Sequence, residues 1–327
     1  MSSGLPDPGA HAIDVRGLAR EYQRDGKTFR ALDGVDLTVP RGEFFGLMCP
    51  NGAGKTTLIR ILTTLLYPTS GEARVAGFKV VGEEGDVRRR INMVSGGESS
   101  GYGLLTVEEN LWMFAQFYGI PGRVATERIA TMLERLDFTA QRRSRVDSLS
   151  TGMRQKMNVI RGLVTEPEVL FLDEPTLGLD VHAARQIRGY LREWIKAAPG
   201  RTILLTTHYM FEADELCDRV AIIDGGKILA CDAPRALKER LGRQLSLNVL
   251  VDRAPTGHAP AGVSSFVVVP ATGADAFDVR MMVEREADVS TALKWLLEQG
   301  LAVRSLSKQD ITLEDVFVSL VGKGLGA

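Results

Sequence analysis

Short apolar runs alternate with amphipathic stretches along the first 240 residues. The apolar runs predict strands at 13–15, 37–39, 44–48, 77–81, 91–94, 169–173, 203–207 and 220–223. The amphipathic stretches predict helices at 56–66, 107–118, 124–136, 150–164 and 181–197. The last three strands have the apolar character of strands buried on both faces of a sheet. The pattern therefore predicts an α/β domain with a largely parallel core sheet.

The pattern changes around residue 241. Beyond it, strands are predicted at 244–251, 265–269, 277–283 and 301–305, and a helix at 289–299. A terminal amphipathic helix is expected to carry Leu313, Val316, Phe317 and Leu320 on one face. We therefore expect a flexible tail at 1–10, an α/β domain at 11–240 and a small α+β domain at 241–327.

Composition narrows the class of protein. Hydrophobic residues make up 44% of the chain and charged residues 25%, which is typical of a soluble globular protein. The net charge of −1 supplies no basic field, so we expect no nucleic-acid partner. Three scattered cysteines suggest a reducing compartment. We find neither a signal peptide nor an apolar stretch of roughly 20 residues, so any link to a membrane is expected to go through a partner.

A phosphate-binding loop is predicted after the strand at 44–48. That strand runs into Cys49-Pro50-Asn51-Gly52-Ala53-Gly54-Lys55-Thr56-Thr57, and a helix follows. A strand, a glycine-rich turn, Lys-Thr and a helix form the Walker A arrangement, so we assign ATP binding to residues from Asn51 to Thr57. Lys55 can reach the β- and γ-phosphates, and the Thr56 hydroxyl can ligate Mg²⁺. Cys49 replaces the first glycine of the usual pattern, which leaves open a tighter or redox-sensitive loop.

A second candidate element is the strand at 169–173, which ends in Asp173 and Glu174. This is a Walker B pattern, in which Asp173 would hold Mg²⁺ and Glu174 would polarise the attacking water. A buried strand with an acidic end is the structural alternative. The phosphate loop upstream favours the catalytic interpretation.

Four further features occur in order with these two. Leu149-Ser150-Thr151-Gly152-Met153 precedes a helix that Ser150 can cap, and a segment from Glu174 ends at Asp180. His208 follows the strand at 203–207, and Tyr22 lies near the N-terminus with Phe29 close by in sequence. Together with the Walker segments, this order resembles the ABC ATPases over residues 11–240.

The resemblance implies a RecA-like core with a helical subdomain at about 100–165 and an antiparallel β subdomain. It also implies a head-to-tail dimer with a second copy or a homologous ATPase subunit. In that dimer each ATP lies between the Walker segments of one subunit and the signature residues Ser150, Thr151, Gly152 and Met153 of the other. Asp180 ends the D-loop, His208 senses the γ-phosphate and is catalytic together with Glu174, and Tyr22 stacks on adenine.

Two sequence segments indicate which group of ABC ATPases the chain resembles most. The signature Leu-Ser-Thr-Gly-Met and the C-terminal Thr312-Leu313-Glu314-Asp315-Val316-Phe317 are similar to ATP-binding proteins of ABC-2-type exporters, including the daunorubicin-resistance type. This resemblance implies a bacterial protein on the cytoplasmic face of the cell membrane, bound to a separate permease. The substrate would be a drug, lipid, polysaccharide or natural product.

The loop after the strand at 91–94 departs from the family, because it contains no glutamine. Glu98 is the nearest substitute as a contact to Mg²⁺, and a solvated loop is the alternative. The segment 102–110 is expected to form part of a permease-binding groove. A non-transport ABC ATPase, of the translation-factor or DNA-repair type, is the rival function. It usually has a second cassette or a coiled-coil insertion, and we find neither.

Overall fold

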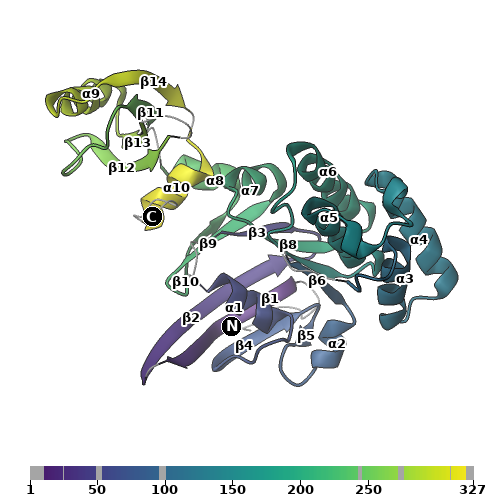
Figure 1. The fold of residues 1–327 in the computed structure, drawn as a ribbon. Coiled ribbons are helices and arrows are strands. Elements are labelled where there is room, and N and C mark those ends of the chain that lie inside the picture. Colours follow the sequence, from purple (N-terminus) through teal and green to yellow (C-terminus); the bar gives the residue numbers. More distant parts are fainter. Residues whose placement is uncertain are drawn as a thin grey trace. The chain divides into compact units, whose positions relative to one another are not determined.

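The structure is a computed structural model, and it describes residues 11–24, 26–48, 54–95, 101–241, 245–271, 276–309 and 311–321. The chain forms two compact units, Met1–Ile228 and Leu229–Ala327 (Figure 1). The division falls within β10 (Lys227–Asp232), short of the boundary expected at residue 240. The predicted tail at 1–10 lies outside the described residues.

The core sheet of the first unit has the strand order β10-β9-β3-β8-β7-β6. Its members besides β10 are β3 (Phe44–Met48), β6 (Ile91–Ser95), β7 (Val169–Asp173), β8 (Thr202–Thr206) and β9 (Arg219–Asp224). Neighbouring strands from β6 to β9 are parallel. All residues of β3 and β8 are buried, as their apolar runs predict. The predicted α/β class with a parallel core is confirmed.

The described part of the first unit also contains helices (Figure 1). They are α1 (Lys55–Leu62), α2 (Glu84–Arg88), α3 (Val107–Phe117), α4 (Gly122–Arg135), α5 (Thr151–Val164), α6 (Val181–Ala197) and α7 (Met210–Leu216). The short 3-10 helices Thr139–Gln141 and Val146–Ser148 lie between α4 and α5. A Cβ atom on Gly162 of α5 would lie 2.4 Å from Cγ2 of Val94, so this glycine lets α5 approach β6 closely.

A separate antiparallel sheet has the order β2-β1-β4-β5. Its strands are β1 (His11–Arg24), β2 (Lys27–Pro40), β4 (Ser70–Val75) and β5 (Phe78–Lys79). The predicted strands at 13–15 and 37–39 are only short segments of β1 and β2, which extend well beyond them. The strand predicted at 77–81 is mostly wrong, because only β5 forms there and β4 precedes it.

The second unit contains α8 (Pro234–Arg240) and an antiparallel sheet of order β12-β13-β11-β14. Its other elements are β11 (Leu245–Val251), β12 (Val263–Pro270), β13 (Phe277–Val283), the 3-10 helix Glu286–Asp288, α9 (Val289–Glu298), β14 (Val303–Gln309) and α10 (Leu313–Val321). Ala292 and Leu296 of α9 pack on the buried valines of β11 and β13. Thr312 and Asp315 exchange backbone and side-chain hydrogen bonds at the start of α10. Leu320, expected on the buried face of this helix, is instead exposed.

Several elements differ from the predictions. The helix expected to reach residue 66 ends at Leu62, because Thr64 adopts a left-handed backbone with φ 62°. The sequence pattern also missed the strands β4 and β10, which are only partly buried, and the short helices α2, α7 and α8. None of the helices in the described part of the chain has the length and hydrophobicity that crossing a bilayer requires.

Candidate functional site

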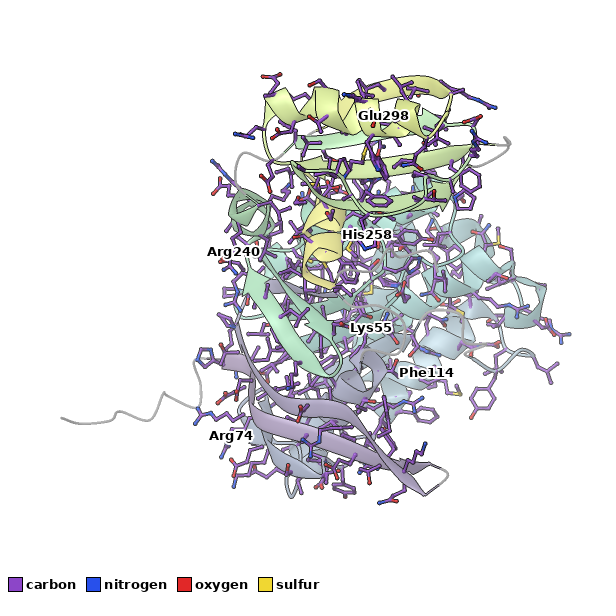
Figure 2. All side chains as sticks on the ribbon, turned by 90° about the vertical axis from the view of Figure 1, so that its left-hand side faces the viewer. Lys55, Arg74, Phe114, Arg240, His258 and Glu298 are labelled. Carbon is purple, nitrogen blue, oxygen red and sulfur yellow. The ribbon has the colours of Figure 1, made fainter. Side chains whose placement is uncertain are left out.

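The candidate site lies where the carboxyl ends of β7 and β8 meet the start of α1. Asp173 at the end of β7 is in register with Thr206 at the end of β8. Lys55 is the first residue of α1 (Figure 2), and Gly54 precedes it with φ 104°. A Cβ atom on Gly54 would lie 2.4 Å from the carbonyl oxygen of Ala31, so this position requires glycine.

Part of the predicted phosphate loop lies outside the described residues. This part includes Asn51, Gly52 and Ala53, together with Cys49, and Glu98 lies outside the described residues as well. Thr56 and Thr57 lie in the first turn of α1, where Thr56 is exposed and Thr57 half-buried.

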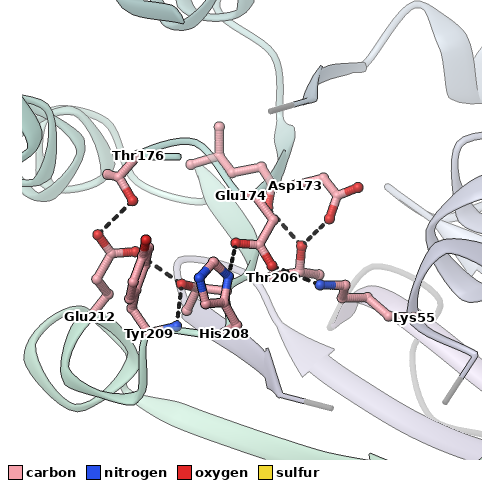
Figure 3. A network of polar contacts seen from close by, with 10 residues as sticks. Lys55, Asp173, Glu174, Thr176, Thr206, His208, Tyr209 and Glu212 are labelled. Atoms are coloured by element: carbon pink, nitrogen blue, oxygen red, sulfur yellow. Dashed lines mark hydrogen bonds and ion pairs between the residues drawn. The ribbon is translucent and has the colours of Figure 1, made fainter. Parts of the chain in front are cut away.

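An ion pair joins Lys55 to the carboxylate predicted as the general base. Nζ of Lys55 lies 2.8 Å from Oε1 of Glu174, and each side chain is 16% exposed (Figure 3). Glu174 has φ 54°, a left-handed conformation that side chains other than glycine rarely adopt. Its backbone N–H donates to the carbonyl oxygen of Thr206 at 3.0 Å, which fixes this turn after β7.

His208 contacts the other oxygen of the same carboxylate. Its Nδ1 lies 2.5 Å from Oε2 of Glu174, and the ring of Tyr209 lies beside the imidazole at a centroid distance of 3.9 Å. The structure thus brings Lys55, Glu174 and His208 together from distant parts of the sequence (Figure 3). Glu174 lies between a cation and an imidazole, and these two contacts orient its carboxylate.

Asp173 and Thr56 provide the oxygen donors that a magnesium ion would need. The Thr206 hydroxyl donates to one oxygen of Asp173. The described residues contain no group of three or more His, Cys, Asp or Glu side chains placed to hold a metal. Mg²⁺ is commonly held by one or two carboxylates, waters and substrate phosphates, so these residues fit the ion as it binds together with a nucleotide.

A buried carboxylate that the sequence analysis did not single out extends the network. Glu212 of α7 accepts hydrogen bonds from the hydroxyls of Thr176 at 2.6 Å and Thr207 at 3.1 Å. Its Oε1 also lies 3.3 Å from the guanidinium of Arg188. The sequence pattern predicts no helix after His208. A glutamate four positions after that histidine was the signal available in the sequence.

The signature residues lie at an exposed helix start. Ser150 caps α5 by accepting from the backbone N–H of Met153 at 3.3 Å, as predicted for this serine. Ser150, Thr151 and Met153 are exposed, while Gly152 is half-buried. Inside α5, Nε2 of Gln155 donates to the carbonyl oxygen of Pro175 at 3.0 Å, and this bond is buried. The signature helix is therefore joined to the segment after Glu174.

Asp180 and Tyr22 also lie in the first unit, Asp180 at the start of α6 and Tyr22 on β1. Asp180 caps α6 by accepting from the backbone N–H of Ala183 at 2.8 Å, and this hydrogen bond lowers the pKa of the Asp180 carboxyl. Tyr22 lies on β1, opposite Phe29 of β2. The guanidinium of Arg20 lies 4.8 Å from the centroid of the Tyr22 ring. The roles of the signature residues, Asp180 and Tyr22 toward a nucleotide stay predictions.

Known proteins resemble this chain over most of its length. The ABC transporter family model matches residues 32–177. The daunorubicin/doxorubicin resistance ATP-binding protein DrrA of Streptomyces peucetius is 37% identical over 312 residues, covering 95% of this chain and 92% of that protein. The doxorubicin resistance ATP-binding protein DrrA of Mycobacterium tuberculosis is 42% identical over 231 residues, covering 71% of this chain and 68% of that protein.

A solved structure shares the fold. The dimeric ATP-binding cassette MJ0796, in a post-hydrolysis state bound to ADP and phosphate, matches with a TM-score of 0.62. The match covers 68% of this chain and 98% of that chain at 24% identity. At this level of identity the likeness concerns the fold alone.

Proposed function

The chain belongs to the ATP-binding subunits of ABC transporters, and from that premise we propose that it drives an ABC-2-type exporter by ATP-dependent dimerisation. Family membership makes it an ATPase whose hydrolysis of ATP serves transport. Within the proposal, residues 11–240 are the ATPase domain and residues 241–327 an accessory domain.

The observation that carries the proposal is the contact of Lys55, Glu174 and His208. The phosphates of ATP are anions that compete with Glu174 for the ammonium group of Lys55. Once released, the Glu174 carboxylate can accept a proton from the attacking water. His208 holds the second carboxylate oxygen and so orients this base.

Mg²⁺ is part of the proposal. Asp173 and Thr56 would hold the ion, which when bound with ATP neutralises charge on the phosphates. The Thr206 hydroxyl keeps one oxygen of Asp173 in place for that task.

The exposed start of α5 supports the proposal of a dimer. Ser150, Thr151, Gly152 and Met153 would contact the ATP of a second subunit, either another copy or a homologous chain. An exposed, serine-capped helix start offers backbone N–H groups and a positive dipole end to a phosphate. Asp180 would contact the opposite subunit, and Tyr22 would stack on adenine.

A groove beside α3 supports the proposal that the chain binds a membrane protein. It has a volume of about 810 Å³ and is lined by residues that include Leu65, Phe114, Phe117, Tyr118, Arg88 and Arg161 (Phe114 in Figure 2). Phe117 and Leu65 are largely exposed, as expected of a surface that a hydrophobic partner covers. Among the described residues, those lining the groove come from other segments than the predicted 102–110. We propose that a cytoplasmic helix of the permease binds here.

The proposed location is the cytoplasmic face of a bacterial membrane, where the permease would hold the chain. The relatives named for daunorubicin and doxorubicin resistance favour a drug-like natural product as the exported substrate. A lipid or polysaccharide would reach the same ATPase through a different permease. Purification of the tagged chain from membranes, followed by mass spectrometry, tests this part. Recovery without any multispanning membrane protein would contradict it.

The catalytic part is tested with Glu174→Gln. Loss of the base is expected to lower kcat by at least about 100-fold while ATP binding persists. Size-exclusion chromatography with ATP should then show a stable dimer, and Lys55→Ala should abolish this dimer. Turnover of Glu174→Gln at the wild-type rate would contradict the assignment of the base.

A further inference from the structure

A buried ionic group lies next to the catalytic residues and has no role in the mechanism above. Glu212 is 3% exposed, and its carboxylate pairs with Arg188 of α6, whose side chain is 12% exposed. A buried ion pair contributes little net stability, because desolvation offsets the attraction between the charges. Stability of the fold alone is therefore a weak explanation for this carboxylate.

The carboxylate of Glu212 holds two buried threonines, one through each oxygen. Oε1 accepts from Thr176 at 2.6 Å, and Oε2 accepts from Thr207 at 3.1 Å (Figure 3). Thr176 and Thr207 are 7% and 2% exposed. Since no solvent competes for these hydroxyls, their positions depend on the carboxylate.

Each threonine adjoins a residue of the proposed catalytic site. Thr176 follows Glu174 by two positions, in a segment that turns through the left-handed backbone of that glutamate. Thr207 directly precedes His208, and its hydroxyl also accepts from the backbone N–H of Tyr209 at 3.0 Å. The backbone is thus fixed on both sides of His208, whose own side chain is 43% exposed and little constrained by packing.

We infer that Glu212 is a positioning residue, which aligns the segments carrying Glu174 and His208 so that the imidazole meets the carboxylate. This inference rests on the proposed roles of Glu174 and His208 in ATP hydrolysis. Glu212 acts through Thr176 and Thr207 and does not touch the nucleotide. Its removal should therefore reduce the rate of the chemical step and leave ATP binding at Lys55 unchanged.

The primary test is Glu212→Gln, in which the amide keeps one acceptor oxygen but loses the charge. We expect kcat for ATP to fall about tenfold, since small misplacements of catalytic groups are costly. KM for ATP should stay within about twofold. The matched control is Glu215→Gln, because Glu215 lies on the same helix and its Oε2 is 2.9 Å from Nε of the same Arg188. Glu215 makes neither of the hydrogen bonds that join Glu212 to Thr176 and Thr207. Glu215→Gln should therefore keep the wild-type kcat.

A double-mutant cycle with His208→Ala separates positioning from a general loss of structure. If Glu212 acts through His208, adding Glu212→Gln to His208→Ala should lower kcat little further. Fully additive losses, or an equal loss in Glu215→Gln, would overturn the inference. If His208→Ala alone keeps wild-type turnover, the proposed catalytic role of His208 is wrong instead.

Folding of the variants is checked by circular dichroism and thermal melting. Should Glu212→Gln fail to fold, Thr207→Val tests the same link with an isosteric change of one hydroxyl. Its kcat is expected to fall severalfold, again with KM for ATP retained. Wild-type kcat in Thr207→Val would refute the proposed link to His208.

Discussion

The pair between Lys55 and Glu174 predicts that removing a catalytic charge tightens ATP binding. Without nucleotide, the ammonium of Lys55 is occupied by the carboxylate 2.8 Å away. ATP must replace this internal anion before its phosphates can use the lysine. In Glu174→Gln a neutral amide takes the place of the competitor, so ATP should bind more strongly although turnover is lost.

The expected gain follows from the loss of the attraction between two full charges, because Lys55 stays charged and can still donate to the amide oxygen of the variant. Double-mutant cycles of exposed ion pairs give up to about 1 kcal/mol for such an attraction. Both side chains are only 16% exposed, so solvent screens the pair in part. The substitution therefore weakens the interaction that competes with ATP for Lys55 by about 1 kcal/mol. That free energy corresponds to about a fivefold lower Kd for ATP.

The assay is a fluorescence titration with an ATP analogue in EDTA, at protein concentrations where light scattering shows a monomer. These conditions separate binding from turnover and from dimerisation. The matched control is Glu168→Gln, which precedes β7 and pairs with Arg41 at 2.8 Å and Arg90 at 3.2 Å. It removes the same charge at the opposite end of the same strand, so its Kd should stay at the wild-type value. Equal or weaker ATP binding by Glu174→Gln, or equal tightening by the control, would refute the reasoning.

Three further predictions concern packing and ionisation. Gly162→Ala should lower the free energy of unfolding by about 1–3 kcal/mol in urea titrations, because the new Cβ meets Val94; Gly189→Ala in α6, where a Cβ meets nothing, should not. The lowered pKa of Asp180 means that its cap stabilises the fold above the unfolded pKa near 3.8 and is lost as pH falls through the lower folded value. Urea titrations should therefore show Asp180→Asn approaching wild-type stability only in acid. Burial raises the pKa of the Cys217 thiol, so peptide mass spectrometry should find it unmodified by iodoacetamide at pH 8 until the protein is denatured.

Continuous apolar runs and the strongest amphipathic stretch were the reliable parts of the sequence pattern. The bounds predicted for β3 and β7 match the structure, because almost all residues of these strands are buried. The bounds predicted for α6 match as well, because one face of this amphipathic helix is buried. The outer parts of β1 and β2 are polar, and their pairing with each other rather than burial makes them strands. Periodicity cannot detect such strands, nor a helix as short as α7.

The candidate site also has a part that the sequence predicts and a part that it does not. Lys55, Glu174 and His208 were predicted from the order of motifs, which a phosphate-handling site requires. Their mutual contacts depend on the turn at Glu174, whose left-handed backbone no local pattern indicates. Glu212 was missed because a glutamate on a short helix suggests a solvated position, and only tertiary packing buries it.

The hydrogen bond from Gln155 to the carbonyl oxygen of Pro175 has a consequence for a dimer with two nucleotides. In the proposed arrangement, the start of α5 faces the nucleotide of the other subunit, while Glu174 faces the subunit's own. A buried amide connects these two surfaces within one chain. A shift of the Glu174 segment during hydrolysis would therefore move the helix that contacts the neighbouring nucleotide. Two such sites would influence each other's occupancy, and ATP consumption would show cooperativity between them.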